Sequence, residues 1–252
     1  MDERIDEFAG EFRAADTAVG FTGAGVSTSS GIPDFRSDDG IWAEHDPETF
    51  TIHRMRRDPE GFWAAMLDVH RTAFAGSSNP NPAHRAFADL ETGGHIEAIV
   101  TQNADRLHQE AGATEVIEVH GNMAEACCLD CSARSEMDDA IDRAEDGELP
   151  PTCRSCGGVL KPAGVLFGEQ LPEYALFRAH ALAERSDVFI VAGSSLSVEP
   201  AASLPETAAD RGATLAIVNL EPTPLDDVAD YVFREDVTKT LPALLNALER
   251  CP

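Results

Sequence analysis

Short apolar runs alternate with amphipathic segments along most of the chain, and this alternation limits the fold more than any other feature. The runs have the length of buried strands, and the segments between them carry apolar residues at helical spacing. Strand–helix alternation of this kind predicts a doubly wound α/β fold, in which helices cover both faces of a parallel sheet. The expected strands are residues 17–22, 96–101, 116–119, 187–192 and 214–219, and the clearest expected helices are 82–90, 174–184 and 201–209.

Two stretches interrupt the alternation and predict a second, smaller domain. Residues 41–79 have helical patterning with several aromatic side chains, and residues 123–159 contain five of the six cysteines. A cleft between two domains would be a natural ligand site. We therefore expect a large sheet domain from residues 1–40, 80–122 and 160–252, and a small inserted domain made of a helical module, 41–79, and a zinc-ribbon module, 123–159.

Four cysteines form two Cys-x-x-Cys pairs that are separated by 21 residues. This spacing is close to the template of a zinc site, and four thiolates fill a tetrahedral shell, so the metal would be structural and not catalytic. Four buried free cysteines or one redox pair are weaker alternatives, because neither explains two copies at this spacing. The expected ligands of one zinc ion per chain are Cys128, Cys131, Cys153 and Cys156, whereas Cys127 and Cys251 receive no role.

Acidic residues dominate the charge balance. The chain has 45 aspartates and glutamates against 19 lysines and arginines, and its net charge is −26. Such a chain is expected to repel nucleic acid and anionic membranes, to attract basic partners, and to suit a salt-rich cytoplasm in which screening weakens self-repulsion. We find neither an apolar run long enough for a membrane span nor the apolar part of a signal peptide, which favours a cytoplasmic protein.

A glycine pair, Gly23 and Gly25, follows the first expected strand. Glycines at these positions would let the backbone approach a pyrophosphate, and the N-terminus of a following helix would favour its charge. The signal is weak by itself, because Thr28 occupies the place of the third glycine in the Gly-x-Gly-x-x-Gly fingerprint of dehydrogenases. A tight strand-to-helix turn would explain the pair equally well.

Polar residues also follow the strands expected at 96–101 and 116–119. Asn103 and Asp105 come directly after the first of these strands, and His120 follows the second. Open α/β sheets bind ligands at this carboxyl edge, although an isolated Asn-x-Asp is more often a helix cap and a lone histidine is more often structural. Their shared place at one edge makes the three residues candidates for a common site.

Taken in order, these segments resemble the motifs of the sirtuins, a family of NAD-dependent protein-lysine deacylases. The resemblance implies a Rossmann-like NAD-binding domain, a mobile loop that closes over NAD, and a deacetylase that produces nicotinamide, O-acetyl-ADP-ribose and deacetylated lysine. It extends from about Val19 to Val237 and includes Gly-Ala-Gly-Val-Ser at 23–27, Gly-Ile-Pro-Asp-Phe-Arg at 31–36, Thr-Gln-Asn-Ala-Asp at 101–105 and His-Gly at 120–121.

The resemblance also assigns roles to individual residues. Asn103 and Asp105 would hold the nicotinamide, and His120 would be the general base, since an imidazole with a pKa near neutrality can accept a proton from a ribose hydroxyl. Phe35 would shield the reacting ribose, and Gln102 would contact it. The residues expected to bind NAD are Gly23, Ala24, Gly25, Ser27, Ile32, Pro33, Asp34, Phe35, Arg36, Gln102, Asn103, Asp105, Gly193, Ser194, Ser195, Asn219, Glu221, Asp236 and Val237.

The segment after the cysteines resembles the sirtuin segment that pairs as an edge strand with the substrate peptide. Backbone pairing of this kind gives affinity with little choice of sequence. Val165 and Phe167 would line the apolar tunnel around the acyl-lysine. The residues expected to bind the substrate are Val165, Phe167, Gly168 and Glu169.

The helical module bears on which acyl group is removed. Sirtuins that prefer succinyl- or malonyl-lysine resemble one another in a Tyr-x-x-Arg pair that contacts the acyl carboxylate. Met66 and Val69 stand at the matching places here, and an unpaired carboxylate between them would be costly to desolvate. We therefore expect a preference for acetyl-lysine, unless a shifted helix brings Arg71 into the pocket.

Three other functions share parts of this pattern. A mono-ADP-ribosyltransferase could use the same site, and a dehydrogenase is disfavoured by the incomplete glycine fingerprint. A zinc-ribbon module for nucleic acid is disfavoured because the cysteine segment has few cations among many acids. The best-supported prediction is a deacetylase that acts on acetylated lysine in a protein or peptide with basic surroundings.

Overall fold

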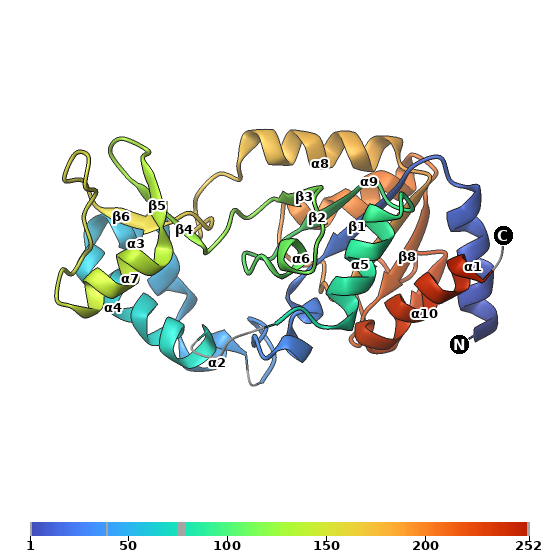
Figure 1. Cartoon of the computed structure of the whole chain (residues 1–252), viewed down its shortest axis with the longest axis horizontal. Coiled ribbons are helices and arrows are strands. Elements are labelled where there is room, and N and C mark those ends of the chain that lie inside the picture. Colours follow the sequence, from blue (N-terminus) through green and yellow to red (C-terminus); the bar gives the residue numbers. More distant parts are fainter. Residues whose placement is uncertain (1, 39, 75–78, 251–252) are drawn as a thin grey trace.

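The computed structural model describes residues 2–38, 40–74 and 79–250. Within these ranges the chain forms a large part built on one sheet and a small part built on another, and both described ends of the chain lie at the far end of the large part (Figure 1). Residues 75–78 of the expected helical module, and Cys251, lie outside the described residues.

The strands of the large part form a parallel sheet in the order β3-β2-β1-β7-β8-β9, six strands among the described residues. Every neighbouring pair is parallel, and the five expected strands are confirmed. The sixth strand, β9, was not predicted. The strands are β1 (Ala18–Thr22), β2 (Ala98–Thr101), β3 (Val116–Glu118), β7 (Val188–Ala192), β8 (Thr214–Val218) and β9 (Tyr231–Phe233).

Helices cover both faces of this sheet, which confirms the doubly wound prediction (Figure 1). One face packs against α1 (Asp2–Ala14), α5 (Pro82–Thr92) and α10 (Val237–Glu249), and the other packs against α8 (Glu173–Arg185) and α9 (Leu204–Asp210). The short helix α6 (Leu107–Glu110) lies beside α5, and the turn η5 (Ala201–Ser203) precedes α9. No helix within the described ranges is long and apolar enough to cross a membrane.

The small part has its own antiparallel sheet, in the order β5-β4-β6, and its own hydrophobic core. Its sheet strands are β4 (Glu125–Cys128), β5 (Arg134–Glu136) and β6 (Leu160–Pro162), and α7 (Met137–Glu145) packs on them. The first insertion contributes α2 (Ile41–Glu44), η3 (Pro47–Phe50), α3 (Ile52–Arg57), α4 (Pro59–Val69) and the π-helical turn η4 (His70–Phe74).

A single core joins the two insertions. Phe62 and Trp63 of α4 are fully buried against Met137 and Ile141 of α7, and the Trp63 indole donates to the Leu160 carbonyl at 2.7 Å. The small domain is therefore built from both insertions, as expected. Because β6 pairs with β4, we propose that the small domain runs three residues past the expected boundary, to Pro162.

Candidate active site

Loops from five strands meet at the carboxyl edge of the large sheet. They follow β1, β2, β3, β7 and β8, and β1 lies between β2 and β7, where the chain order reverses. Open α/β sheets bind ligands at such a switch point. The candidate residues lie on these loops, and their geometry decides what the site can do.

The glycine loop after β1 packs directly on the loop after β7. The Gly25 N–H donates to the Gly193 carbonyl at 2.8 Å, and a Cβ atom at Gly23 would lie 2.8 Å from the same oxygen and 2.9 Å from Ser194. Glycine is therefore required here for contact between two loops, whether or not a phosphate binds. The glycines are followed by two three-residue 3₁₀ helices, η1 (Ala24–Val26) and η2 (Thr28–Ser30), and not by a long helix whose N-terminus would favour a pyrophosphate's charge.

Ser27, Asn103 and Asp105 form one hydrogen-bonded cluster. The Ser27 hydroxyl donates to Asp105 Oδ2 at 2.7 Å, and the Asn103 amide donates to Ser27 Oγ and to the Gly23 carbonyl, each at 3.1 Å. The Leu107 N–H donates to Asp105 Oδ1 at 2.9 Å, so both carboxylate oxygens are held. The cluster presents a fixed amide and a fixed carboxylate beside the glycine loop.

Two buried histidines, which the sequence did not single out, support this cluster. The Asn81 N–H donates to His84 Nδ1 at 3.3 Å, so Nε2 carries the proton and faces Ser27 Oγ at 3.3 Å. His108 Nε2 lies 3.0 Å from Thr22 Oγ1, and the two imidazole centroids are 4.9 Å apart. Among the described residues, His108 Nδ1 has no hydrogen-bond partner.

Burial keeps both histidines uncharged. It lowers the pKa of His84 to about 4, although the nearby Asp105 charge acts in the opposite direction. Burial, together with the neighbouring His84, lowers the pKa of His108 well below the usual imidazole value. Near neutral pH the pair therefore donates and accepts hydrogen bonds without adding positive charge behind Asp105.

His120 lies two residues after β3, on the segment that leads from the large sheet to β4 of the small sheet. Its Nδ1 donates to the Gln102 carbonyl at 2.9 Å, which leaves the Nε2 lone pair available to accept a proton. Burial lowers the pKa of His120, and the bond to Gln102 raises it in part. The imidazole is thus neutral at pH 7, as a general base must be.

Other expected cofactor residues are held by contacts within the protein. Gln102 Nε2 donates to Ser194 Oγ at 2.8 Å, and the Ser195 and Ser197 hydroxyls are 2.9 Å apart. After β8, the Asn219 amide donates to the Glu221 carbonyl at 2.8 Å.

The last two expected cofactor residues lie at the start of α10. Asp236 caps this helix by accepting from the Thr238 N–H at 2.8 Å, and Val237 is buried in the core. The fold therefore uses one oxygen of the Asp236 carboxylate and the Val237 side chain.

The loop that contains Ile32, Pro33, Asp34, Phe35 and Arg36 leads into the small domain. The Asp34 carboxylate accepts from the N–H groups of Arg36 and Ser37, at 2.9 and 2.8 Å, which fixes the turn. Phe35 is 41% exposed and stacks on Trp42, with 5.3 Å between the ring centroids. Trp42 in turn contacts Phe167 of the expected peptide segment, with 5.8 Å between the ring centroids. Aromatic rings therefore connect the expected NAD loop with the expected peptide segment.

A cavity of about 300 Å³ lies between the two domains. Ile32, Met66 and Asp105 all line it, which brings the helical module next to the nicotinamide candidates. Arg71 is absent from the described lining. It instead pairs with Glu145 on the surface, with 2.9 Å between Arg71 Nη2 and Glu145 Oε1. Asp105, Glu110 and Asp138 also line the cavity, Val69 does not, and the described lining contains no arginine or lysine that could pair with an acyl carboxylate.

The expected peptide segment, Lys161 to Glu169, begins in β6, and its part from Ala163 to Glu169 lies at the junction of the domains. The Val165 N–H donates to the His120 carbonyl at 2.8 Å, and the Phe167 N–H donates to the Phe50 carbonyl at 3.1 Å. Phe167 is 43% exposed, and Gly168 has a φ of +81°, a conformation that favours glycine. The Glu169 carboxylate turns inward and lies 3.0 Å from Lys161 Nζ.

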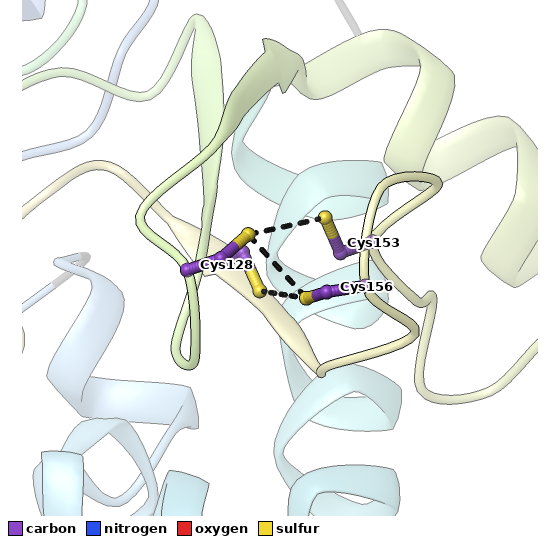
Figure 2. A group of neighbouring side chains, drawn as sticks. Cys128, Cys153 and Cys156 are labelled. Carbon is purple, nitrogen blue, oxygen red and sulfur yellow. Dashed lines mark hydrogen bonds between the residues drawn. The ribbon is translucent and has the colours of Figure 1, made fainter.

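The four expected metal ligands converge in the small domain. The Sγ atoms of all four cysteines lie within 4.8 Å of one another, with separations of 3.5 Å for Cys128–Cys156, 3.7 Å for Cys131–Cys153 and 3.3 Å for Cys131–Cys156. Figure 2 shows the sulfur atoms of Cys128, Cys153 and Cys156 turned toward a common centre. Tetrahedral zinc with Zn–S bonds of about 2.3 Å requires sulfur atoms about 3.8 Å apart, so the cysteines fit one structural zinc ion.

Comparisons with known proteins agree with this geometry. Residues 23–200 match the model of the Sir2 family. An NAD-dependent protein deacetylase from Haloarcula marismortui is 49% identical over 249 residues, which cover 98% of this chain and 95% of the relative.

Two solved structures are also similar over nearly the whole chain. A Sir2 structure with a p53 peptide and NAD⁺ has a TM-score of 0.87 at 39% identity and covers 97% of this chain and 98% of its own. A second, with a deacetylated p53 peptide and 3′-O-acetyl-ADP-ribose, has a TM-score of 0.89 at 40% identity and covers 96% and 97%.

Proposed function

Because the chain belongs to the Sir2 family and is an NAD-dependent protein deacetylase, we propose that the carboxyl-edge site of the large sheet binds NAD and carries the reaction. The observation that carries this proposal is the position of His120. Its imidazole is hydrogen-bonded to the carbonyl of Gln102, the residue directly before Asn103, so it lies next to the Ser27–Asn103–Asp105 cluster. When bound, NAD supplies an electrophilic ribose carbon and nicotinamide as a neutral leaving group.

We propose that Asn103 and Asp105 hold the carboxamide of nicotinamide. Both N–H groups of the Asn103 amide already donate within the protein, so the Asn103 amide oxygen and the Asp105 carboxylate would act as acceptors for the carboxamide N–H groups. Ser27 and Leu107 already fix both Asp105 oxygens, so the carboxylate does not need to reorganise when a ligand binds. Ile32, which lines the same cavity as Asp105, would form an apolar wall.

His120 acts in this proposal as the general base that takes a proton from a ribose hydroxyl. Its Nδ1 is used by the Gln102 carbonyl, and its lowered pKa keeps Nε2 unprotonated at pH 7. Both features support a base at this position and disfavour an acid.

The remaining expected residues form the rest of the proposed NAD site. Gly23, Gly25, Gly193 and Ser194 lie at the switch point, where the phosphates would bind. Asn219 and Glu221 follow β8 and would contact the adenosine ribose.

We propose that the acetyl-lysine peptide adds as a strand to residues 163–168. The N–H groups of Ala163, Val165 and Phe167 already donate to other protein carbonyls. On the alternate set, Leu166 donates to the Glu169 carboxylate, whereas Gly164 and Gly168 donate to no backbone group among the described residues. Alternate N–H groups along a strand point to opposite edges, so the edge of Gly164 and Gly168 is the one that a peptide would use.

The net charge of −26 supports a peptide with basic surroundings and argues against nucleic acid and anionic membranes. We also propose a cytoplasmic location, because four thiolates that bind zinc are best kept reduced there.

The test is to incubate the purified protein with NAD and an acetyl-lysine peptide and to identify the products by mass spectrometry. Deacetylated peptide, nicotinamide and O-acetyl-ADP-ribose in equal amounts are expected. Label from NAD that remains on protein would instead indicate mono-ADP-ribosyl transfer. A product mixture without deacetylated peptide would contradict the proposed reaction.

A further inference from the structure

Lys161 is a buried cation in a chain that has only two lysines. Its side chain is 9% exposed, and it lies at the centre of β6, opposite Cys127 of β4. Nζ lies 2.7 Å from the Pro162 carbonyl, 3.0 Å from the Gly164 carbonyl and 3.0 Å from Glu169 Oε2. An ammonium group has three N–H donors, so each of them has an acceptor.

Glu169 closes the other end of the same segment. Its Oε2 accepts from the Leu166 N–H at 2.8 Å, and its own N–H donates to the Leu166 carbonyl at 3.0 Å. Oε2 is thereby shared by Lys161 and Leu166. Because Leu166 alternates with Val165 and Phe167, whose N–H groups face the protein, Glu169 holds an N–H group of the edge on which a peptide would lie.

The ion pair therefore holds the peptide segment at two points. Lys161 fixes Gly164 near its start, and Glu169 fixes Leu166 near its end. Between these points the Val165 N–H is bonded to the His120 carbonyl, so the path of the segment is linked to the position of the proposed base.

A buried ion pair adds little net stability compared with apolar residues of the same size, because both charges lose their hydration. The best-attested use of such a pair is to select one geometry. Here the geometry that it selects is that of the edge on which the substrate would lie.

We propose that Lys161 and Glu169 are positioning residues for the acyl-peptide: they set the path of residues 163–168 without contacting the substrate. This inference rests on the proposed role of that segment as the peptide-binding strand. It also gives Glu169 a role different from direct substrate contact.

The experiment compares Lys161→Met and Glu169→Gln with the wild-type protein. The glutamine oxygen in the second variant can still accept the Leu166 N–H, so that variant removes the charge and retains the turn. Because misplacement of a binding edge weakens every bond along it, the KM for acetyl-peptide is expected to rise at least about tenfold in both variants. The Kd for NAD should stay within about threefold, since the NAD edge is untouched, whereas kcat at saturating peptide should fall together with peptide affinity, because the Val165 N–H links the segment to the His120 carbonyl.

A double variant distinguishes positioning from general damage. Lys161→Met leaves Glu169 as a buried unpaired charge, and adding Glu169→Gln removes that charge, so the peptide KM should partly recover. Lys239→Met, at the exposed second lysine, is the matched control and should behave as the wild type. Zinc content and circular dichroism establish folding, and if Lys161→Met does not fold, Glu169→Gln provides the test.

The two proposals fail in different ways. A wild-type protein without NAD-dependent deacetylation would remove the proposed function and this inference with it. An active wild type whose folded variants keep the wild-type peptide KM would overturn the positioning role alone. Equal losses in peptide KM and NAD Kd would also overturn it, because they indicate general disruption.

Discussion

The uncharged state of His84 makes a quantitative prediction about stability in acid. Lowering the pH from 8 to 5 protonates a histidine in the unfolded chain, where its pKa is near 6.5, but not in the folded protein, where burial lowers the pKa to about 4. The unfolded state then binds more protons than the folded state, so lowering the pH favours unfolding. The stabilising contribution is complete above pH 6.5 and is lost as the pH falls toward 4.

The size of the effect follows from these two pKa values. For a single site, the linkage relation gives a loss of about 2 kcal/mol in the free energy of unfolding between pH 8 and pH 5. His84→Gln removes this titration, while the glutamine oxygen can still accept the Asn81 N–H. The variant will be less stable at every pH, but its loss between pH 8 and pH 5 should be smaller than that of the wild type by about 2 kcal/mol.

Urea denaturation followed by tryptophan fluorescence at both pH values, in high salt to screen the acidic surface, measures this difference. His53→Gln, at an exposed histidine, is the matched control. If wild type and His84→Gln lose the same free energy between the two pH values, the buried imidazole is not held neutral as inferred.

Four further predictions concern the reaction and the metal. His120→Ala should lower turnover by about 100- to 10,000-fold with little change in NAD binding, and turnover within twofold of the wild type would exclude the role. In the wild type, the acid limb of the pH profile of kcat/KM should lie below pH 6.5, because burial lowers the pKa of His120. Asp105→Asn should weaken nicotinamide inhibition, and an unchanged inhibition constant argues against the assignment. One zinc per chain is expected by metal analysis, and Cys128→Ser should lose the metal and unfold the small domain; active protein without zinc contradicts this. Because Met66 lines the cavity and Arg71 does not, acetyl-lysine should be preferred over succinyl-lysine by at least about tenfold, or about 1.4 kcal/mol, and equal rates on matched peptides would refute it.

The sheet could be predicted because its strands are buried on both faces. Runs such as the one that becomes β7 contain no polar residue, which is typical of a strand covered by helices on both sides. β9 was missed because its apolar run is limited to Tyr231–Phe233 between Asp230 and Arg234, whereas the run at β3, which is equally short as a strand, continues to Val119. The first helix could have been found, since Ile5, Phe8 and Phe12 repeat at helical spacing and are buried in the structure.

The site residues at the carboxyl edge of the large sheet could be predicted only from their sequence motifs. The contacts that hold these residues in place could not be predicted. His84 differs from other histidines because Ser27 and Asn81 are its partners. The sequence around His84 does not indicate that Ser27, which is distant in the chain, lies beside it. The contact between Gly23 and Gly193 joins loops that are far apart in the chain, so local sequence could not reveal it.

The position of His120 between the two sheets has a mechanical consequence. Its ring is bonded to the Gln102 carbonyl at the NAD edge, and its own carbonyl holds the Val165 N–H of the peptide segment. A displacement of that segment would therefore also move the imidazole, because the segment is bonded to the backbone of His120 itself. Peptides that hold the segment loosely should react slowly as well as bind weakly, so sequence preference would be expressed in the rate of the chemical step and not in affinity alone.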